Sequence, residues 1–165
     1  MIAHVLPVDW RKTLKELSEL CSRERPELLV NFGVSGRANG YVIEQVAKNA
    51  CGTSVDACGV RARGRFVTHK NDPASLPTRL PADQIVTRMT ALGIPARLSD
   101  DSGTYLCNAV FYQSVKLAGV ENSDMLSGFI HMPPLYSRSF SHERALAGGL
   151  EIVRVCLGLP LVTET

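Results

Sequence analysis

Five cysteines stand at positions 21, 51, 58, 107 and 156, and Cys107 lies where a thiol could act as a nucleophile. It follows the segment SDDSGTYL, which we expect to lead from a strand into a helix. In the first turn of a helix, unpaired backbone N–H groups and the helix dipole stabilise an anion. Cys107 is therefore a better candidate nucleophile than Cys21 and Cys156, which fall on apolar helix faces. A buried structural cysteine is the alternative interpretation of Cys107.

A cysteine nucleophile needs a base and a group that orients the base. His131 ends the apolar segment GFIH and precedes two prolines, so a strand predicted there would end at an imidazole. Ligands of open α/β sheets lie beyond the carboxyl ends of strands, and we expect His131 and Cys107 at such ends. Glu44 is the only acid between Val30 and Gly52, and it is our candidate for orienting the imidazole. The alternative for Glu44 is a strand-edge position pointing at water.

The elements that must position these side chains alternate along the chain. Apolar periodicity and helix-stop residues predict helices over 10–21, 81–92, 104–118 and 141–157, and short apolar runs predict strands over 27–33, 41–47, 96–99 and 126–132. Residues 41–47 also fit a helix, but their β-branched side chains favour a strand. Asp9 is the expected N-cap of the first helix. This alternation predicts a single α/β domain over residues 1–165 with a largely parallel sheet.

A Gly-, Arg- and Pro-rich stretch from 52 to about 80 interrupts this alternation. Within it, residues 60–67 alternate, with Arg61, Arg63 and Arg65 on one side, as expected of an exposed strand or hairpin arm. The arginine stripe could contact nucleic acid, but a solvated hairpin or a contact between subunits is the favoured interpretation.

Composition limits the class of protein. The chain has 165 residues, 45% hydrophobic and 21% charged, which suits one folded domain and excludes a disordered chain. The net charge of +2 is too small to indicate binding to nucleic acid or to an anionic membrane. We expect no membrane span, because no apolar run approaches about 20 residues, and no signal peptide, because the first residues lead directly to Pro7 and a charged run. The odd number of cysteines suggests free thiols in the cytoplasm.

Two other functions fit the sequence poorly. Gly33, Gly36 and Gly40 match neither dinucleotide-binding nor phosphate-binding loop spacing. A cysteine phosphatase would have an arginine six positions after Cys107, where this chain has Gln113.

Three segments together resemble the active-site blocks of pyroglutamyl peptidase I, a family of cysteine peptidases. They are residues 32–49 (FGVSGRANGYVIEQVAKN), 99–111 (SDDSGTYLCNAVF) and 128–133 (GFIHMP). The order of glutamate, cysteine and histidine also agrees, as does the segment Leu6-Pro7-Val8 before the first helix. The similarity covers most of the chain and is weakest from 52 to 80.

This resemblance implies a three-layer α/β/α sandwich with a mostly parallel, twisted sheet. It implies that Cys107 is the nucleophile, His131 the general base and Glu44 the orienting carboxylate, with no metal or other cofactor. Tyr105, Leu106 and Val55 match positions that line the pocket for the lactam ring. The substrate would be a peptide with a blocked N-terminus, and the enzyme a homo-oligomer.

The sequence also departs from the family pattern. The family's first strand and its Gly-Phe-Pro loop, which helps to form the oxyanion hole, have no counterpart before Ile2, so we expect a domain that is short at its N-terminus. Val34 stands where a glutamine is usual, and an arginine expected near 53 is absent. Loss of an oxyanion-hole donor costs roughly 100- to 1000-fold in rate. The alternative function is therefore a catalytically impaired or inactive truncated member of the family.

Overall fold

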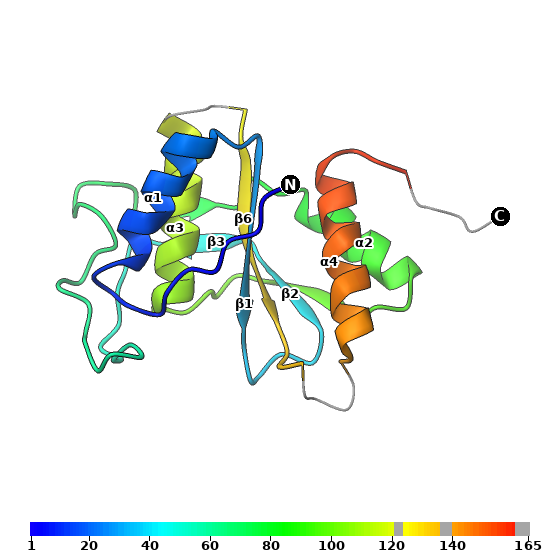
Figure 1. The fold of residues 1–165 in the computed structure, drawn as a ribbon, viewed down its shortest axis with the longest axis horizontal. Coiled ribbons are helices and arrows are strands. Elements are labelled where there is room, and N and C mark those ends of the chain that lie inside the picture. The colour runs from blue at the N-terminus through cyan, green and yellow to red at the C-terminus, as the bar shows by residue number, and fades with distance from the viewer. Residues whose placement is uncertain (121–123, 136–139, 161–165) are drawn as a thin grey trace.

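A computed structural model describes residues 1–120, 124–135 and 140–160 as helices packed on both faces of a central sheet (Figure 1). The elements in chain order are α1 (Thr13–Glu24), β1 (Leu28–Val34), β2 (Tyr41–Glu44), β3 (Val46–Lys48), β4 (Ser75–Pro77), α2 (Ala82–Ala91), β5 (Ala96–Ser99), α3 (Leu106–Val120), β6 (Leu126–Met132) and α4 (His142–Cys156). The predicted α/β class, with helices in the two outer layers, is confirmed.

The central sheet has the strand order β1-β6-β2-β5, and most of its pairings are parallel. Strands β1 and β6 are parallel, and so are β2 and β5. The two parallel pairs are joined in the middle by antiparallel pairing of β2 with β6. A separate antiparallel pair, β3 with β4, continues from the end of β2.

Each face of the sheet buries its own apolar cluster. Helices α1 and α3 cover one face and α2 and α4 cover the other (Figure 1). Successive side chains of a strand point to opposite faces, so Phe129 packs in the cluster under α1 and α3 while Ile130 packs in the cluster under α2 and α4. Burial of each such side chain stabilises the fold by about 1.5–3 kcal/mol.

The start of α1 differs from the prediction. The helix begins at Thr13 rather than at Trp10, and its N-cap residue is Lys12, without a side-chain cap. Asp9 is therefore not the N-cap. Its carboxylate instead accepts a hydrogen bond from the backbone N–H of Arg11 at 2.7 Å, while its carbonyl accepts those of Lys12 and Thr13. These bonds close a turn before the helix.

The alternating residues 60–67 do not form the predicted strand or hairpin arm. The segment is an irregular loop with exposed arginines, held to the body by hydrogen bonds from Cys51 N–H to the Arg65 carbonyl and from Val67 and Thr68 N–H to the Asn49 side-chain oxygen. An alternating pattern predicts a strand only where a neighbouring strand is available to pair with it. The short strand β4, which the sequence analysis missed, supplies the pairing partner of β3 instead.

Two consecutive glycines of α4 allow a matched test of packing. A Cβ atom at Gly148 would lie 2.8 Å from Cζ of Tyr41, a ring that is 1% exposed and whose hydroxyl donates to the Ala145 carbonyl. A Cβ atom at Gly149 would meet no other atom. Gly148→Ala is expected to lower the free energy of unfolding by about 1–3 kcal/mol, whereas Gly149→Ala should raise it by up to about 1 kcal/mol. Urea unfolding measures both values, and equal stability of the two variants would contradict the packing described for Tyr41.

Candidate active site

Glu44 and His131 form a buried contact across the antiparallel strands β2 and β6. Glu44 is paired with Phe129 and Val42 with His131, so Glu44 and His131 are diagonal neighbours on one face of the sheet. His131 Nδ1 lies 2.8 Å from Glu44 Oε1, and the Glu44 side chain is 2% exposed. The register of these two strands therefore brings the imidazole and the carboxylate together.

Cys107 is the second residue of α3, and its sulfur lies close to the same part of the sheet. A Cβ atom added to Gly33 would lie 3.3 Å from Cys107 Sγ and 2.6 Å from Phe129 Cζ. Gly33 is also the residue of β1 that pairs with His131. The thiol therefore packs against the backbone of Gly33, beside His131. The three predicted catalytic side chains come together on the face of the sheet covered by α1 and α3.

The surroundings of His131 favour the imidazolium form. Burial lowers the pKa of His131, but hydrogen bonds with the side chains of Cys107 and Glu44, and the negative charge of those groups, raise it by more, to about 9. The Phe129 ring lies 4.9 Å from the imidazole, centre to centre, and closes one side of it. A proton held between a thiol and a carboxylate in this way is what a cysteine nucleophile and its general acid–base partner require.

The other cysteines have surroundings that do not suit a nucleophile. Burial raises the pKa of Cys156 to about 11 and also raises that of Cys51, which disfavours both thiolates. Cys21 is buried, and the sulfur of the exposed Cys58 faces the Asp9 carboxylate at 3.8 Å.

Asn108 holds the first turn of α3 in place, a role that the sequence analysis missed. This side chain has no exposed surface. Its amide donates to the carbonyls of Lys48 and Ala50, and its oxygen accepts from the Lys48 N–H and the Ser102 hydroxyl, all at 2.8–2.9 Å. Four bonds satisfy every polar site of the amide, so the residue next to Cys107 is fixed to β3. The only signal in the sequence is a polar residue at a position where the helix faces the core.

The predicted substrate-binding residues lie around the approach to α3. The Tyr105 hydroxyl donates to the Val55 carbonyl at 3.2 Å, so these two residues, 50 positions apart, are in contact. Val55 is 48% exposed. Leu106 is almost fully buried, and only a small part of its side chain is open to a ligand.

The prediction of how the fold brings Cys107 and His131 together is wrong in one respect. We expected Cys107 and His131 to lie at the carboxyl ends of successive strands in a largely parallel sheet, where they would meet. However, β6 runs antiparallel to β2, and β5 runs parallel to β2, so the carboxyl ends of β5 and β6 point in opposite directions. The loop from Asp100 to Tyr105 leads the chain to α3, and the groups meet on a face of the sheet.

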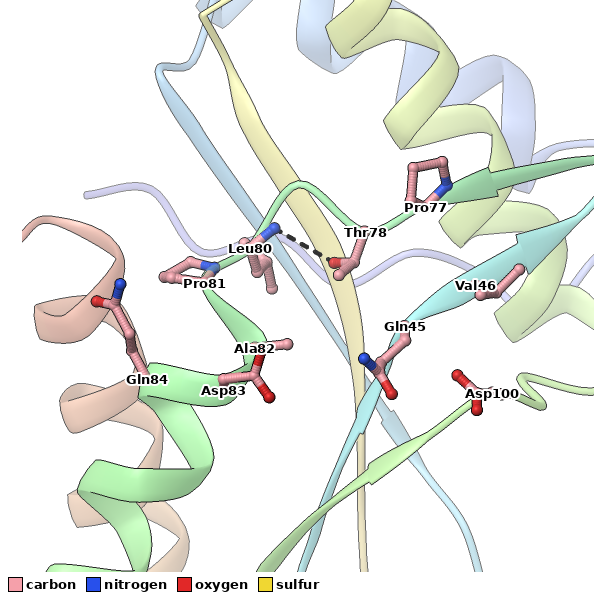
Figure 2. A pocket seen from close by; sticks show the side chains of 10 residues that line it. All are labelled: Gln45, Val46, Pro77, Thr78, Leu80, Pro81, Ala82, Asp83, Gln84 and Asp100. Atoms are coloured by element: carbon pink, nitrogen blue, oxygen red, sulfur yellow. Dashed lines mark hydrogen bonds between the residues drawn. The ribbon is translucent and has the colours of Figure 1, made fainter.

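A cavity of about 410 Å³ lies between the N-terminus of α2 and the junction of β2 with β3 (Figure 2). Its lining includes Gln45, Thr78, Asp83 and Asp100, and neither Cys107, His131 nor Glu44 is part of it. Among the residues that the structure describes, no cluster of three or more His, Cys, Asp or Glu side chains is arranged to hold a metal ion. None of the described helices combines the length and the apolar character of a membrane span.

The chain is similar to known proteins over most of its length. The family model described as pyroglutamyl peptidase matches residues 1–152. The pyrrolidone-carboxylate peptidase of Oceanobacillus iheyensis is 29% identical over 96% of this chain and 80% of its own length, and that of Yersinia pestis is 30% identical over 98% and 75%. A crystal structure of the Pyrococcus furiosus pyrrolidone carboxyl peptidase superposes with a TM-score of 0.87 at 27% identity, covering 93% of this chain and 80% of that one.

The raised pKa of His131 predicts a pH dependence of stability. A folded-state pKa of about 9, against an ordinary value of 6.5, means that this group stabilises the fold below about pH 6.5 and that the stabilisation is lost as the pH rises through 9. The difference in free energy of unfolding between wild type and His131→Gln should fall by roughly 3 kcal/mol between pH 6 and pH 10. Urea unfolding across this range measures it.

Glu44→Gln provides the matched test of the cause. It removes the negative charge but keeps the shape of the side chain, so the pKa of His131, followed by NMR, should move down from about 9. An unchanged pKa in this variant would show that Glu44 does not stabilise the imidazolium.

Proposed function

This chain belongs to the pyroglutamyl peptidase family of cysteine peptidases, and we propose that it removes an N-terminal pyroglutamyl residue from peptides. The observation that carries the proposal is the convergence of Cys107, His131 and Glu44 on one face of the sheet. The substrate is a peptide whose N-terminus is blocked by the lactam, and Tyr105, Leu106 and Val55 line the site that receives the ring.

The proposed reaction uses the proton that His131 holds. The Cys107 thiolate attacks the carbonyl carbon of the pyroglutamyl amide, and the imidazolium of His131 gives its proton to the leaving amine. The neutral imidazole then takes a proton from water, which attacks the thioester and releases pyroglutamate. Since His131 Nδ1 faces Glu44, Nε2 is the nitrogen that exchanges these protons. Glu44 keeps the ring oriented and stabilises its charged form.

We also propose that the protein is cytoplasmic and forms a homo-oligomer. None of the five cysteines, all of which the structure describes, forms a disulfide, as expected in a reducing compartment. Leu146 and Leu150 on α4 and Leu157 directly after it are 64%, 46% and 53% exposed, and Leu146 and Leu150 lie one helical turn apart. A second copy of this chain, packed helix against helix, would bury this apolar stripe.

Removal of the nucleophile tests the activity. Cys107→Ala is expected to lower kcat/KM for a fluorogenic pyroglutamyl amide by at least about 10⁴-fold, and iodoacetamide at neutral pH should label Cys107 first in the wild type. Cys58→Ser, which changes an exposed thiol outside the triad, should retain activity within about twofold. A wild type that cleaves no pyroglutamyl amide although Cys107 is alkylated rapidly would support the alternative, an impaired or inactive family member.

Charged substitutions on α4 test the oligomer. The double variant Leu146→Glu and Leu150→Glu should have a lower molar mass than the wild type in size-exclusion chromatography with light scattering, because two carboxylates would be buried without partners. Leu92→Glu, at the end of α2, is the control that should leave the mass unchanged. A monomeric wild type at micromolar concentration would contradict the proposal.

A further inference from the structure

Three segments that are distant in sequence meet beside the start of α3. The ring of Trp10, from the turn before α1, packs edge to face on Tyr105, with centroids 5.7 Å apart and an interplanar angle of 89°. Val55, from the long loop, accepts the Tyr105 hydroxyl through its carbonyl. Together, Trp10, Tyr105 and Val55 form a wall. Because Tyr105 is two residues before Cys107, this wall lies next to the nucleophile.

The polar atoms of both rings are already occupied. Trp10 Nε1 donates to the Ser54 carbonyl at 3.4 Å, and the Tyr105 hydroxyl donates to Val55. Trp10 and Tyr105 are half-buried, and Val55 is exposed. The surface that these side chains leave open is therefore mostly aromatic and apolar. The apolar face of an uncharged lactam ring fits against such a surface.

One buried carboxylate holds this wall together. Asp56 is 6% exposed, and its Oδ2 accepts the backbone N–H of Trp10 at 2.8 Å. Its Oδ1 accepts the N–H groups of Cys58 and Val60, also at 2.8 Å, which closes the loop that follows Val55. Burial raises the pKa of Asp56, but these three N–H groups lower it by more, so the carboxylate stays ionised. Asp56 thus fixes Trp10 and the loop that carries Val55 at the same time.

We propose that Trp10 is a specificity-determining residue whose indole forms one side of the site for the lactam ring, and that Asp56 is the positioning residue that holds it there. This assignment rests on the proposed function. The indole then supplies an apolar contact that a cyclic lactam can use and a linear amide cannot, and the position of that wall comes from a carboxylate that does not touch the substrate.

Trp10 is the only tryptophan of the chain, so its fluorescence reports on this wall directly. Titration of the wild type with 2-pyrrolidone, the lactam alone, should change the Trp10 emission in a saturable way. Acetamide, which has the amide but lacks the ring, should not. If a wild type that hydrolyses pyroglutamyl amides shows no saturable change, the assignment of Trp10 is overturned while the proposed function stands.

Kinetic constants separate positioning from general structural support. Trp10→Ala and Asp56→Ala should each raise KM for a pyroglutamyl amide by roughly 10- to 100-fold with kcat changed less than about threefold, and Trp10→Phe should recover most of the loss. Asp72→Asn is the matched control, because Asp72 holds the Thr68–His69 turn in the same long loop without contacting Trp10. An unchanged KM in both alanine variants would overturn the inference.

The remaining outcomes are also decisive. If Asp56→Ala fails to fold, Trp10→Phe and Trp10→Ala still decide the role of the indole. If the wild type cleaves no pyroglutamyl amide, the proposed function fails, and a saturable response to 2-pyrrolidone alone would still support a lactam site at Trp10. Absence of both activity and response would overturn both.

Discussion

The contact between Glu44 and His131 is the constraint on which the rest of the site depends. A buried carboxylate is costly unless it is paired, and in the described part of the chain Oε2 of Glu44 accepts no hydrogen bond, which leaves the imidazole as its main partner. Because the two residues are diagonal neighbours on β2 and β6, a slip of one residue between these strands would turn Glu44 to the opposite face. The chemistry of the site therefore fixes the register at the centre of the sheet.

Cys107 is held next to Glu44 and His131 by main-chain contacts and by the side-chain amide of Asn108. Asn108 fastens the first turn of α3 to β3, and β3 continues directly from the strand that carries Glu44. The carboxylate and the thiol are therefore positioned by one continuous piece of backbone, residues 44–50, clamped to α3. Cys107 and His131 lie on a helix and a strand. The wall formed by Trp10, Tyr105 and Val55 comes instead from irregular segments, which the hydrogen bonds of Asp56 hold in place.

Residue types and apolar runs were enough to predict the α/β class and most element positions. They did not predict how the candidate catalytic groups meet, because strand direction depends on pairing over long distances and leaves no mark in a local pattern. The alternation around Arg61 to Arg65 did not predict a strand correctly for a related reason: in the described part of the chain, no strand lies beside this segment to pair with it. The residue type of Asp9 predicts a helix cap, although its carboxylate accepts a hydrogen bond within the turn that precedes the helix. The role of Asn108 is visible only once β3 is in place.

Gly33 has a consequence for how much this site can vary. A side chain at this position would collide with the Phe129 ring and contact Cys107 Sγ, so the thiol packs here against main chain and not against a side chain. We call this stretch of backbone the floor of the site. Substitution elsewhere can alter the walls of the site, but the depth at which the sulfur sits is a property of the sheet itself. A designer who wished to enlarge the site would have to work from its rim, since the floor admits no larger residue without displacing the aromatic ring beneath it.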